Sequence, residues 1–167
     1  MKNLSEKFKE IDKTPVFTIP YYSRAEFSMH ELMEYLLEVC GPASLRLSTF
    51  SLSEIAVRTL FRLVEKGKIT GLECILDTTV KRHRLGLLYF ASNIATTIGL
   101  TKNHAKILLL DNHLHHWVVV GSSNMNVNDK IEAGIVSSDP MLVSRFSLWF
   151  DEELQICSHI ISPDEFE

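Results

Sequence analysis

The residue types best suited to chemistry lie beside two short apolar runs in the second half of the chain. His104 and Lys106 are two residues apart at the start of the first run. In an extended strand this spacing places both side chains on one face, about 7 Å apart. Ser122 and Asn124 repeat the spacing just after the second run. If the two runs pair, a His-Lys pair therefore comes to lie alongside a Ser-Asn pair.

Such a cluster suits the chemistry of phosphate esters. An imidazole can attack phosphorus or transfer a proton near neutral pH. A lysine ammonium and an asparagine amide can donate hydrogen bonds to the non-bridging oxygens, and these bonds strengthen as charge builds up in the transition state. A nearby carboxylate, such as that of Glu132, can hold the imidazole in one tautomer. The sequence therefore indicates half of a phosphodiester-processing site.

Two antiparallel strands are expected to position these residues. Residues 106–110 and 117–120 are continuous apolar runs, and the link of residues 111–116 is too short for a crossover helix. Residues 131–136 are expected to form the next strand, which carries Glu132.

The link itself is expected to lie outside the site. Asp111 has the opposite parity to His104, so its side chain should point to the other face, where it can begin the turn. His113, His115 and His116 fit a solvated loop better than a metal site, because no carboxylate or cysteine accompanies them at ligand spacing.

The residues before this hairpin alternate between strand and helix patterns. Capping boxes at Ser28 with Glu31 and at Ser51 with Glu54 each precede apolar residues at helical spacing. The alternation is typical of a parallel sheet covered by helices. We therefore predict an α/β fold with a mixed, mostly parallel β-sheet sandwiched between helix layers. The expected strands are 44–50, 72–80, 106–110, 117–120 and 131–136, and the expected helices are 28–40, 51–66, 84–94 and 139–150.

One domain is expected over residues 23–157. Residues 1–22 are polar and charged and are predicted to form an N-terminal arm, with an optional short strand near Val16. Residues 158–167 are predicted to form a frayed C-terminal tail.

Composition narrows the class of protein further. The net charge of −4 argues against a protein that coats nucleic acid through bulk positive charge, but it allows a local basic groove. The three cysteines are odd in number and far apart, which favours free thiols over a disulfide framework or a zinc site. The sequence shows neither a secretory leader nor a bilayer-spanning run, so a cytoplasmic location is expected.

The segment from residue 104 to residue 132 resembles the signature of the phospholipase D superfamily. That signature is His-x-Lys-x-x-x-x-Asp followed by Gly-Ser-x-Asn. The matching residues here are His104, Lys106, Asp111, Gly121, Ser122 and Asn124. A glutamate, Glu132, follows on the next predicted strand, as in many family members. The resemblance implies a phospholipase D-like fold over residues 28–153.

The resemblance also implies a homodimer. Family active sites contain two copies of the motif, whereas this chain shows one: His30 and His83 are each followed two residues later by leucine. A second copy of the chain would supply the other half of the site. One His104 would then attack phosphorus and form a phosphohistidine. His104 of the partner subunit would protonate the leaving group and then activate water.

The family's remaining roles carry over residue by residue. Lys106 and Asn124 would hold the phosphoryl oxygens with help from Ser122, and Glu132 would orient His104. Asp111 and Gly121 would be structural. The resemblance implies that neither a metal ion nor a cofactor is required.

Small single-motif members that dimerise are commonly nucleases, so the resemblance favours nucleic acid as the substrate. The basic residues Lys81, Arg82 and Arg84 follow a predicted strand and are candidates for contact with a phosphate backbone. Two alternatives remain open. One is a nucleic-acid-binding or nucleotide-binding protein of the same fold with little turnover, and the other is a hydrolase of phospholipid head groups.

Overall fold

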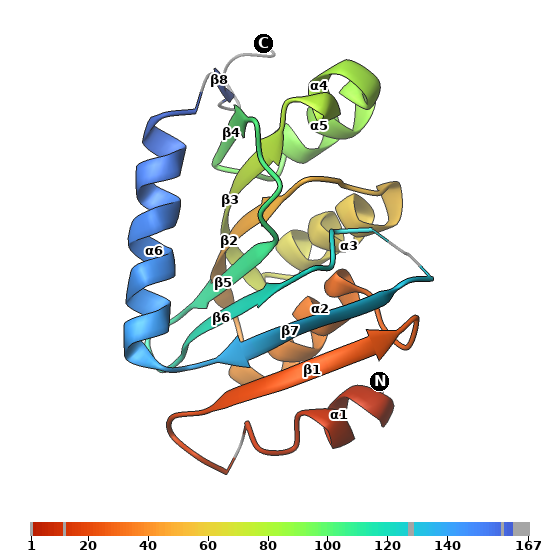
Figure 1. Cartoon of the computed structure of the whole chain (residues 1–167). Helices are drawn as coiled ribbons and strands as arrows, with labels where there is room; N and C mark the ends of the chain where they lie inside the picture. Colours follow the sequence, from red (N-terminus) through yellow and green to blue (C-terminus); the bar gives the residue numbers. More distant parts are fainter. Residues whose placement is uncertain (1, 12, 127–128, 158, 162–167) are drawn as a thin grey trace.

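A computed structural model describes residues 2–11, 13–126, 129–157 and 159–161. Within these residues the chain forms one eight-stranded sheet in the order β1-β7-β6-β5-β2-β3-β4-β8 (Figure 1). The strands are β1 (Thr18–Arg24), β2 (Ala43–Thr49), β3 (Ile69–Asp77), β4 (Thr97–Thr101), β5 (Ile107–Asp111), β6 (His116–Gly121), β7 (Ile131–Ser137) and β8 (His159–Ile161).

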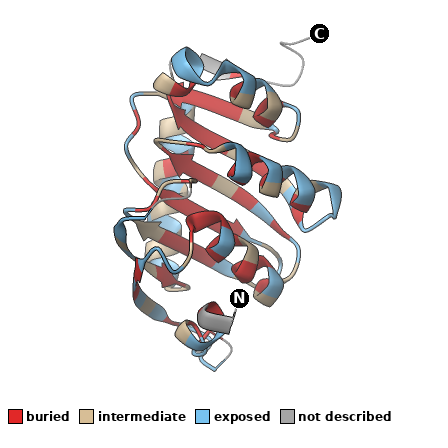
Figure 2. Cartoon of the chain, turned by 90° about the vertical axis from the view of Figure 1, so that its right-hand side faces the viewer, coloured by how far each residue is buried: buried red, intermediate tan, exposed pale blue. Residues whose placement is uncertain are grey.

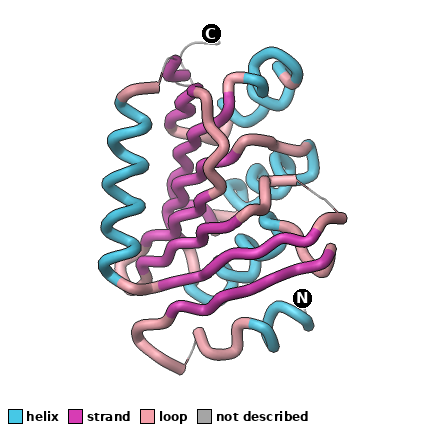
Figure 3. Tube along the Cα trace, viewed as in Figure 1, coloured by secondary structure: helices cyan, strands magenta, loops and turns pink. Residues whose placement is uncertain are grey.

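Helices cover both faces of this sheet (Figure 3). On one face α6 (Pro140–Gln155) packs along β5 and β6. The other face carries α2 (Met29–Cys40), α3 (Glu54–Glu65), the short α4 (Thr79–His83) and α5 (Leu85–Ser92). The strands between the two layers are largely buried (Figure 2), because apolar residues alternate toward the two helix layers along each strand. In the described part of the chain, no helix combines the length and apolarity needed to cross a bilayer.

The sheet is mixed, which confirms the predicted α/β class, but the balance of strand directions differs from the prediction. Among the strands of the described chain, parallel pairing is confined to β2, β3 and β4. The remaining neighbours, including the pairs of β5 with β2 and of β8 with β4, are antiparallel. The loops after β4, β5 and β6 are short and reverse the chain, whereas a parallel strand pair needs a crossover helix between its strands. The longer connection through α6 also reverses the chain, so β8 runs antiparallel to β4.

The N-terminal residues belong to the folded core, in contrast to the arm expected over residues 1–22. The segment contributes α1 (Lys2–Lys7) and most of β1, which pairs with β7 along its whole length. Phe8 and Tyr21 are buried and meet edge to face, with ring centroids 5.8 Å apart. Polar residues and prolines interrupt the stretch between Phe8 and Tyr21, so the sequence shows no apolar periodicity that would predict the burial of these two rings. Residues 1 and 12 lie outside the described part.

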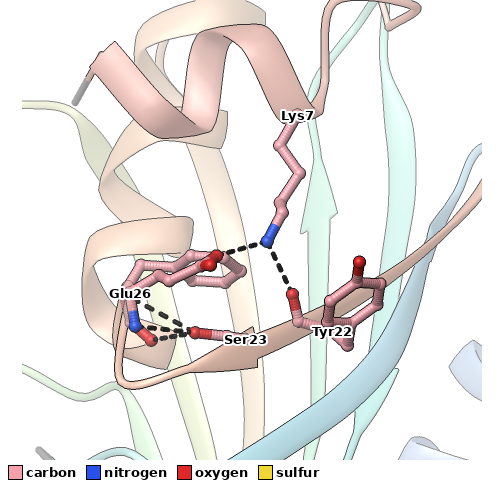
Figure 4. Close-up of polar contacts among 5 residues, drawn as sticks. Lys7, Tyr22, Ser23 and Glu26 are labelled. Atoms are coloured by element: carbon pink, nitrogen blue, oxygen red, sulfur yellow. Dashed lines mark hydrogen bonds and ion pairs between the residues drawn. The ribbon is translucent and has the colours of Figure 1, made fainter.

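One lysine joins α1 to the far end of β1 (Figure 4). The Lys7 Nζ donates to the Tyr22 carbonyl at 2.6 Å and to a Glu26 carboxylate oxygen at 2.5 Å. Ser23 Oγ accepts from the backbone amides of Glu26 and Phe27, and Ala25 adopts a positive φ of 56° in the same turn. These contacts fix the end of β1, which lies beside the start of β7.

Several predicted element boundaries shift. Ser28 and Glu31 form the expected capping box, but α3 is capped by Ser53 rather than Ser51. Leu52 bridges to Met125, which keeps residues 51–53 out of the helix. The strand expected over 72–80 corresponds to β3, which ends at Asp77. The last two residues of the predicted range belong to α4 instead.

Two strands near the C-terminal half were not predicted. β4 follows α5 directly, and β8 pairs with β4 inside the segment expected to be a tail. Residues 158 and 162–167 of that tail lie outside the described part. Cys40, Cys74 and Cys157 are free thiols, as expected.

Candidate active site

The ends of five strands meet at one edge of the sheet. β2 and β3 are parallel, and their carboxyl ends carry Thr49 and Asp77. β5 runs antiparallel to β2, so its first residue, Ile107, pairs with Ser48 near the end of β2. β6 then ends and β7 begins at the same edge, because Ile107 pairs with Val120 and Gly121 pairs with Gly134. This edge therefore collects the residues immediately before β5, after β6 and at the start of β7.

Asn103 anchors the segment that precedes β5, a role that the sequence analysis missed. Its side chain is buried, and its backbone amide donates to Asp77 Oδ2 at 2.9 Å. Its Oδ1 accepts from the backbone amide of Ala105 at 2.9 Å. Its amide nitrogen donates to three acceptors at the ends of β2 and β3: Ser48 Oγ at 3.0 Å, the Thr49 carbonyl at 3.3 Å and the Ile75 carbonyl at 3.1 Å.

Asp77, which accepts the hydrogen bond from the Asn103 backbone amide, is held as a carboxylate. Burial alone would raise its pKa, but hydrogen bonds from the side chain and backbone of Thr79 and from the Asn103 amide, together with the nearby His104, lower the pKa below the ordinary value of 3.8. Asp77 ends β3 and Asn103 lies in the loop between β4 and β5, so this buried pair leaves no periodic signal in the sequence.

His104 and Lys106 lie in direct contact, closer than the separation of about 7 Å expected for side chains two residues apart in an extended strand. The Lys106 Nζ is 3.0 Å from His104 Nδ1 and donates to the His104 carbonyl at 2.5 Å. The lysine is buried and the imidazole is exposed. Burial lowers the pKa of Lys106, and the charge of Glu132 partly offsets that effect. The Phe50 ring lies beside both groups, 5.1 Å from the His104 ring centroid and 5.8 Å from the Lys106 Nζ.

Ser122 connects the end of β6 to the start of β7. Its hydroxyl donates to the Glu132 carboxylate and accepts from the Ala133 amide at 3.1 Å. Its backbone amide donates to the Ala133 carbonyl at 3.0 Å. The Glu132 charge also acts on Lys106, so the carboxylate and the ammonium face the same region.

Asn124 is held by the loop after β2. Its side-chain carbonyl accepts from Thr49 Oγ1 and from the backbone amide of Ser51, both at 3.3 Å. Thr49 Oγ1 in turn accepts from the Met125 amide at 3.2 Å. Because the carbonyl is engaged on this side, the amide donors of Asn124 point away from the loop.

A tyrosine beneath the strands explains the glycine of the motif. Tyr21 pairs with Gly134, which pairs with Gly121, so the three residues form one rung of the sheet. A Cβ at position 121 would lie 2.8 Å from the Ala133 carbonyl oxygen and 2.9 Å from the Tyr21 hydroxyl. The Tyr21 hydroxyl is buried and has no hydrogen-bond partner among the described residues. Burial, and then the charge of Glu132, raise the pKa of Tyr21 to about 12.

Other sequence-predicted residues lie elsewhere. Asp111 is at the opposite end of β5, exposed and 3.1 Å from His116 Nδ1. Lys81 and Arg82 are exposed on α4 rather than at the end of a strand. Arg84 comes closer to the site, because its guanidinium donates to the Leu52 carbonyl at 3.1 Å.

The arrangement suits phosphate chemistry. It combines an exposed imidazole, a buried ammonium in contact with it, amide donors and a hydroxyl-bound carboxylate at one edge. Among the side chains that the structure describes, no three histidine, cysteine, aspartate or glutamate residues gather to hold a metal ion.

The sequence matches no protein-family model and no curated protein sequence. Solved structures with the same fold include the phospholipase D family member Nuc from Salmonella typhimurium (TM-score 0.64, 16% identity, covering 88% of this chain and 99% of that one). NucT from Helicobacter pylori is similar (TM-score 0.65, 14% identity, 84% and 98%). TrmBL2, an archaeal chromatin protein, shares the fold over 93% of this chain and 59% of its own (TM-score 0.53, 14% identity). The phospholipase D-like fold that the motif implied is thereby confirmed.

Proposed function

We propose that the chain is a member of the phospholipase D superfamily and a metal-independent phosphodiesterase, specifically a nuclease, whose active site forms between two copies of the chain. The contact of the Lys106 ammonium with the His104 imidazole carries the proposal. An imidazole and an ammonium lie side by side at the sheet edge that also holds Ser122, Asn124 and Glu132, which supports the roles of nucleophile and oxyanion-binding cation.

In the proposed reaction His104 attacks the phosphorus of a diester. A nitrogen–phosphorus bond forms and the bond to the leaving oxygen breaks, while that oxygen takes a proton from His104 of the partner subunit. The deprotonated imidazole then removes a proton from water, the hydroxide attacks the phosphohistidine and the first imidazole is released. Lys106 and Asn124 donate to the non-bridging oxygens in both steps.

The observed contact between Lys106 and His104 indicates which ring nitrogen of His104 carries the proton before the reaction begins. An ammonium has no lone pair, so His104 Nδ1 is the acceptor and a neutral ring carries its proton on Nε2. Before this ring can protonate a leaving group it must take up a second proton, because the imidazolium and not the neutral imidazole is the acid near neutral pH, and Lys106 must then leave Nδ1. The attacking ring needs the opposite tautomer, with a lone pair on Nε2. That tautomer becomes available when Lys106 turns from Nδ1 to the phosphoryl oxygens.

The need for a second copy is supported by what one chain offers. The described site holds one imidazole, whereas the two-step reaction requires an attacking ring and a proton-donating ring. Tyr22 on β1 and Ile131 on β7 are 71% and 63% exposed. They lie on neighbouring strands next to the Ser23–Glu132 pair, where strand alternation places them on the other face of the sheet from Glu132. Apolar side chains next to an incomplete site suit contact with a partner subunit.

The test is hydrolysis of DNA and of bis(p-nitrophenyl) phosphate in EDTA by wild type and by His104→Ala. We expect wild type to turn over both substrates and His104→Ala to lose at least about 1,000-fold in rate. His116→Ala is the matched control, because His116 is exposed at the opposite end of β6. Equal rates for wild type and His104→Ala would refute the mechanism.

A mixing experiment tests the shared site. When wild type and His104→Ala are unfolded together in equal amounts and refolded, random pairing leaves about one quarter of the dimers with two intact imidazoles. A shared site predicts activity near one quarter of the wild-type value, whereas independent sites predict one half.

A second candidate is a nucleic-acid-binding protein of the same fold with little turnover. The likeness to TrmBL2, whose structure is described as showing a novel mode of DNA binding, favours it. Trapping a phosphohistidine on His104 would exclude this reading.

A further inference from the structure

A cleft opens next to His104, between the loop after β2 and helix α4. Its volume is about 180 Å³. Phe50 and Leu52 form one wall, and Val80, His83 and Arg84 form the other. None of these side chains was assigned a catalytic role above.

Phe50 joins the cleft to the proposed active site. Its ring lines the cleft and also lies 5.1 Å from the His104 ring, centroid to centroid. A group seated in the cleft is therefore separated from the attacking imidazole by one aromatic ring. A phosphodiester bound at His104 would direct one of its two substituents toward this opening.

The lining suits a flat aromatic group with polar edges. The Phe50 ring and the side chains of Leu52 and Val80 supply apolar surface, while the exposed His83 and Arg84 supply donors at the rim. Arg84 is held in place by its bond to the Leu52 carbonyl. Nucleobases bind such surfaces by stacking on the aromatic ring and by hydrogen bonding at their edges.

The size of the cleft restricts the ligand. Sites for drug-sized ligands begin at about 300 Å³, so this cleft has room for one small ring system and not for a base pair. Inside a duplex a base is stacked and paired, so it must leave the helix before it can enter a pocket.

We propose that this Phe50–Arg84 cleft binds an unpaired nucleobase next to the scissile phosphate, so that the substrate is single-stranded nucleic acid. The proposal rests on the proposed phosphodiesterase function and names its substrate class. It gives Arg84 a contact with the base, whereas Lys81 and Arg82 do not line the cleft.

The experiment compares three substrates of equal length: a single-stranded oligonucleotide, the same strand with abasic sites, and its duplex. For wild type we expect kcat/KM on the intact single strand to exceed that on the abasic strand and on the duplex by at least about tenfold. Phe50→Leu removes the stacking surface, so the ratio of intact to abasic strand should fall toward one. Using a ratio within each variant cancels any shift of His104 caused by the substitution.

Phe61→Leu is the matched control, because Phe61 packs against Phe90 on another part of the surface. It should keep the wild-type ratio. A wild-type ratio near one, an unchanged ratio in Phe50→Leu, or equal cleavage of duplex and single strand would overturn the proposal.

A binding measurement separates this proposal from the proposed function. Fluorescence anisotropy with the same single strand and His104→Ala protein requires no turnover. If no substrate is hydrolysed, the proposed function fails. The cleft proposal then stands only if Phe50→Leu in the His104→Ala background weakens binding of the intact strand and not of the abasic strand.

Discussion

The backbone amide of Asn103 donates a 2.9 Å hydrogen bond to the carboxylate of Asp77, which ties the residue before His104 to the end of β3. The same asparagine also bonds to the end of β2 through its side chain. The proposed nucleophile, His104, thus follows directly after Asn103, which is held by hydrogen bonds from both its backbone and its side chain. Its position is set by two parallel strands that carry none of the motif residues.

Asn103→Ala should lower the free energy of unfolding by about 2–3 kcal/mol, because it removes the donors to three buried acceptors. Urea unfolding measures this change. Asn93→Ala is the control, since Asn93 makes a single exposed bond to the Tyr89 carbonyl. A loss no larger than that of the control would contradict the anchoring role.

Asp77→Asn should change how stability depends on acid. The pKa of Asp77 is lowered in the folded protein, so the unfolded chain binds the proton more tightly. The stabilisation is present above the ordinary value of 3.8 and is lost as the pH falls through the lower folded value. The gap in unfolding free energy between wild type and Asp77→Asn should therefore narrow below that value. Asp129→Asn, an exposed carboxylate, should show no such narrowing.

Gly121→Ala should destabilise the protein by about 1–3 kcal/mol and impair the site. The new methyl group would meet the Ala133 carbonyl oxygen, which is backbone and has little room to shift. Gly86→Ala is the control, because a Cβ there meets nothing within 4 Å. Thermal unfolding of both variants decides the matter, and similar midpoints would show that the strands yield at position 121.

Tyr21→Phe should leave stability at neutral pH within about 1 kcal/mol of wild type, because the hydroxyl it removes has no described partner. At high pH the free energies of unfolding of wild type and Tyr21→Phe should diverge. Tyr21 keeps its proton up to about 12 in the folded chain, against 10.0 ordinarily, so wild-type stability falls as the pH rises above 10.0. Ultraviolet titration should lose a component with a midpoint near pH 12 in Tyr21→Phe and keep it in Tyr22→Phe, whose side chain is exposed.

Lys106→Met should separate stability from activity. Burial lowers the lysine pKa, which means that the charged form is held at a cost. Replacing it with an apolar chain of similar length should keep or raise the unfolding free energy, while turnover falls by at least about 100-fold. Lys102→Met, at an exposed position, should leave turnover unchanged. A destabilised Lys106→Met would argue that the ammonium serves the fold.

Local spacing was enough to predict the motif residues. His104 and Lys106 meet as expected, although both lie in the irregular segment just before β5. The short link after Asp111 forces the antiparallel return that brings Ser122 to the same edge of the sheet. Asp111 lies away from these residues because it ends β5 at the opposite end of the strand, whereas the sequence argument had used the alternation of side chains. These inferences needed only strand geometry.

Contacts distant in sequence were beyond such reasoning. Tyr21 reaches Gly121 because β1 adds to the sheet beside β7, a pairing that no local pattern announces. Phe50 meets His104 because β2 lies next to β5. Lys81 and Arg82 looked like strand-end residues until α4 placed them on a helix. For Tyr21 and Phe50 the order of the strands in the sheet determined which residue they contact.

The register of the central strands has a dynamic consequence. Ser48, Ile107, Val120 and Ile135 form one continuous rung, and the motif residues sit directly beyond it. The half of the proposed active site that one chain contributes is thus attached to the ladder of backbone hydrogen bonds. Local unfolding of these residues therefore requires the central strands β2, β5, β6 and β7 to separate. Amide exchange at the start of β5 and the end of β6 should therefore proceed about as slowly as global unfolding, so the apparatus remains assembled for as long as the chain remains folded.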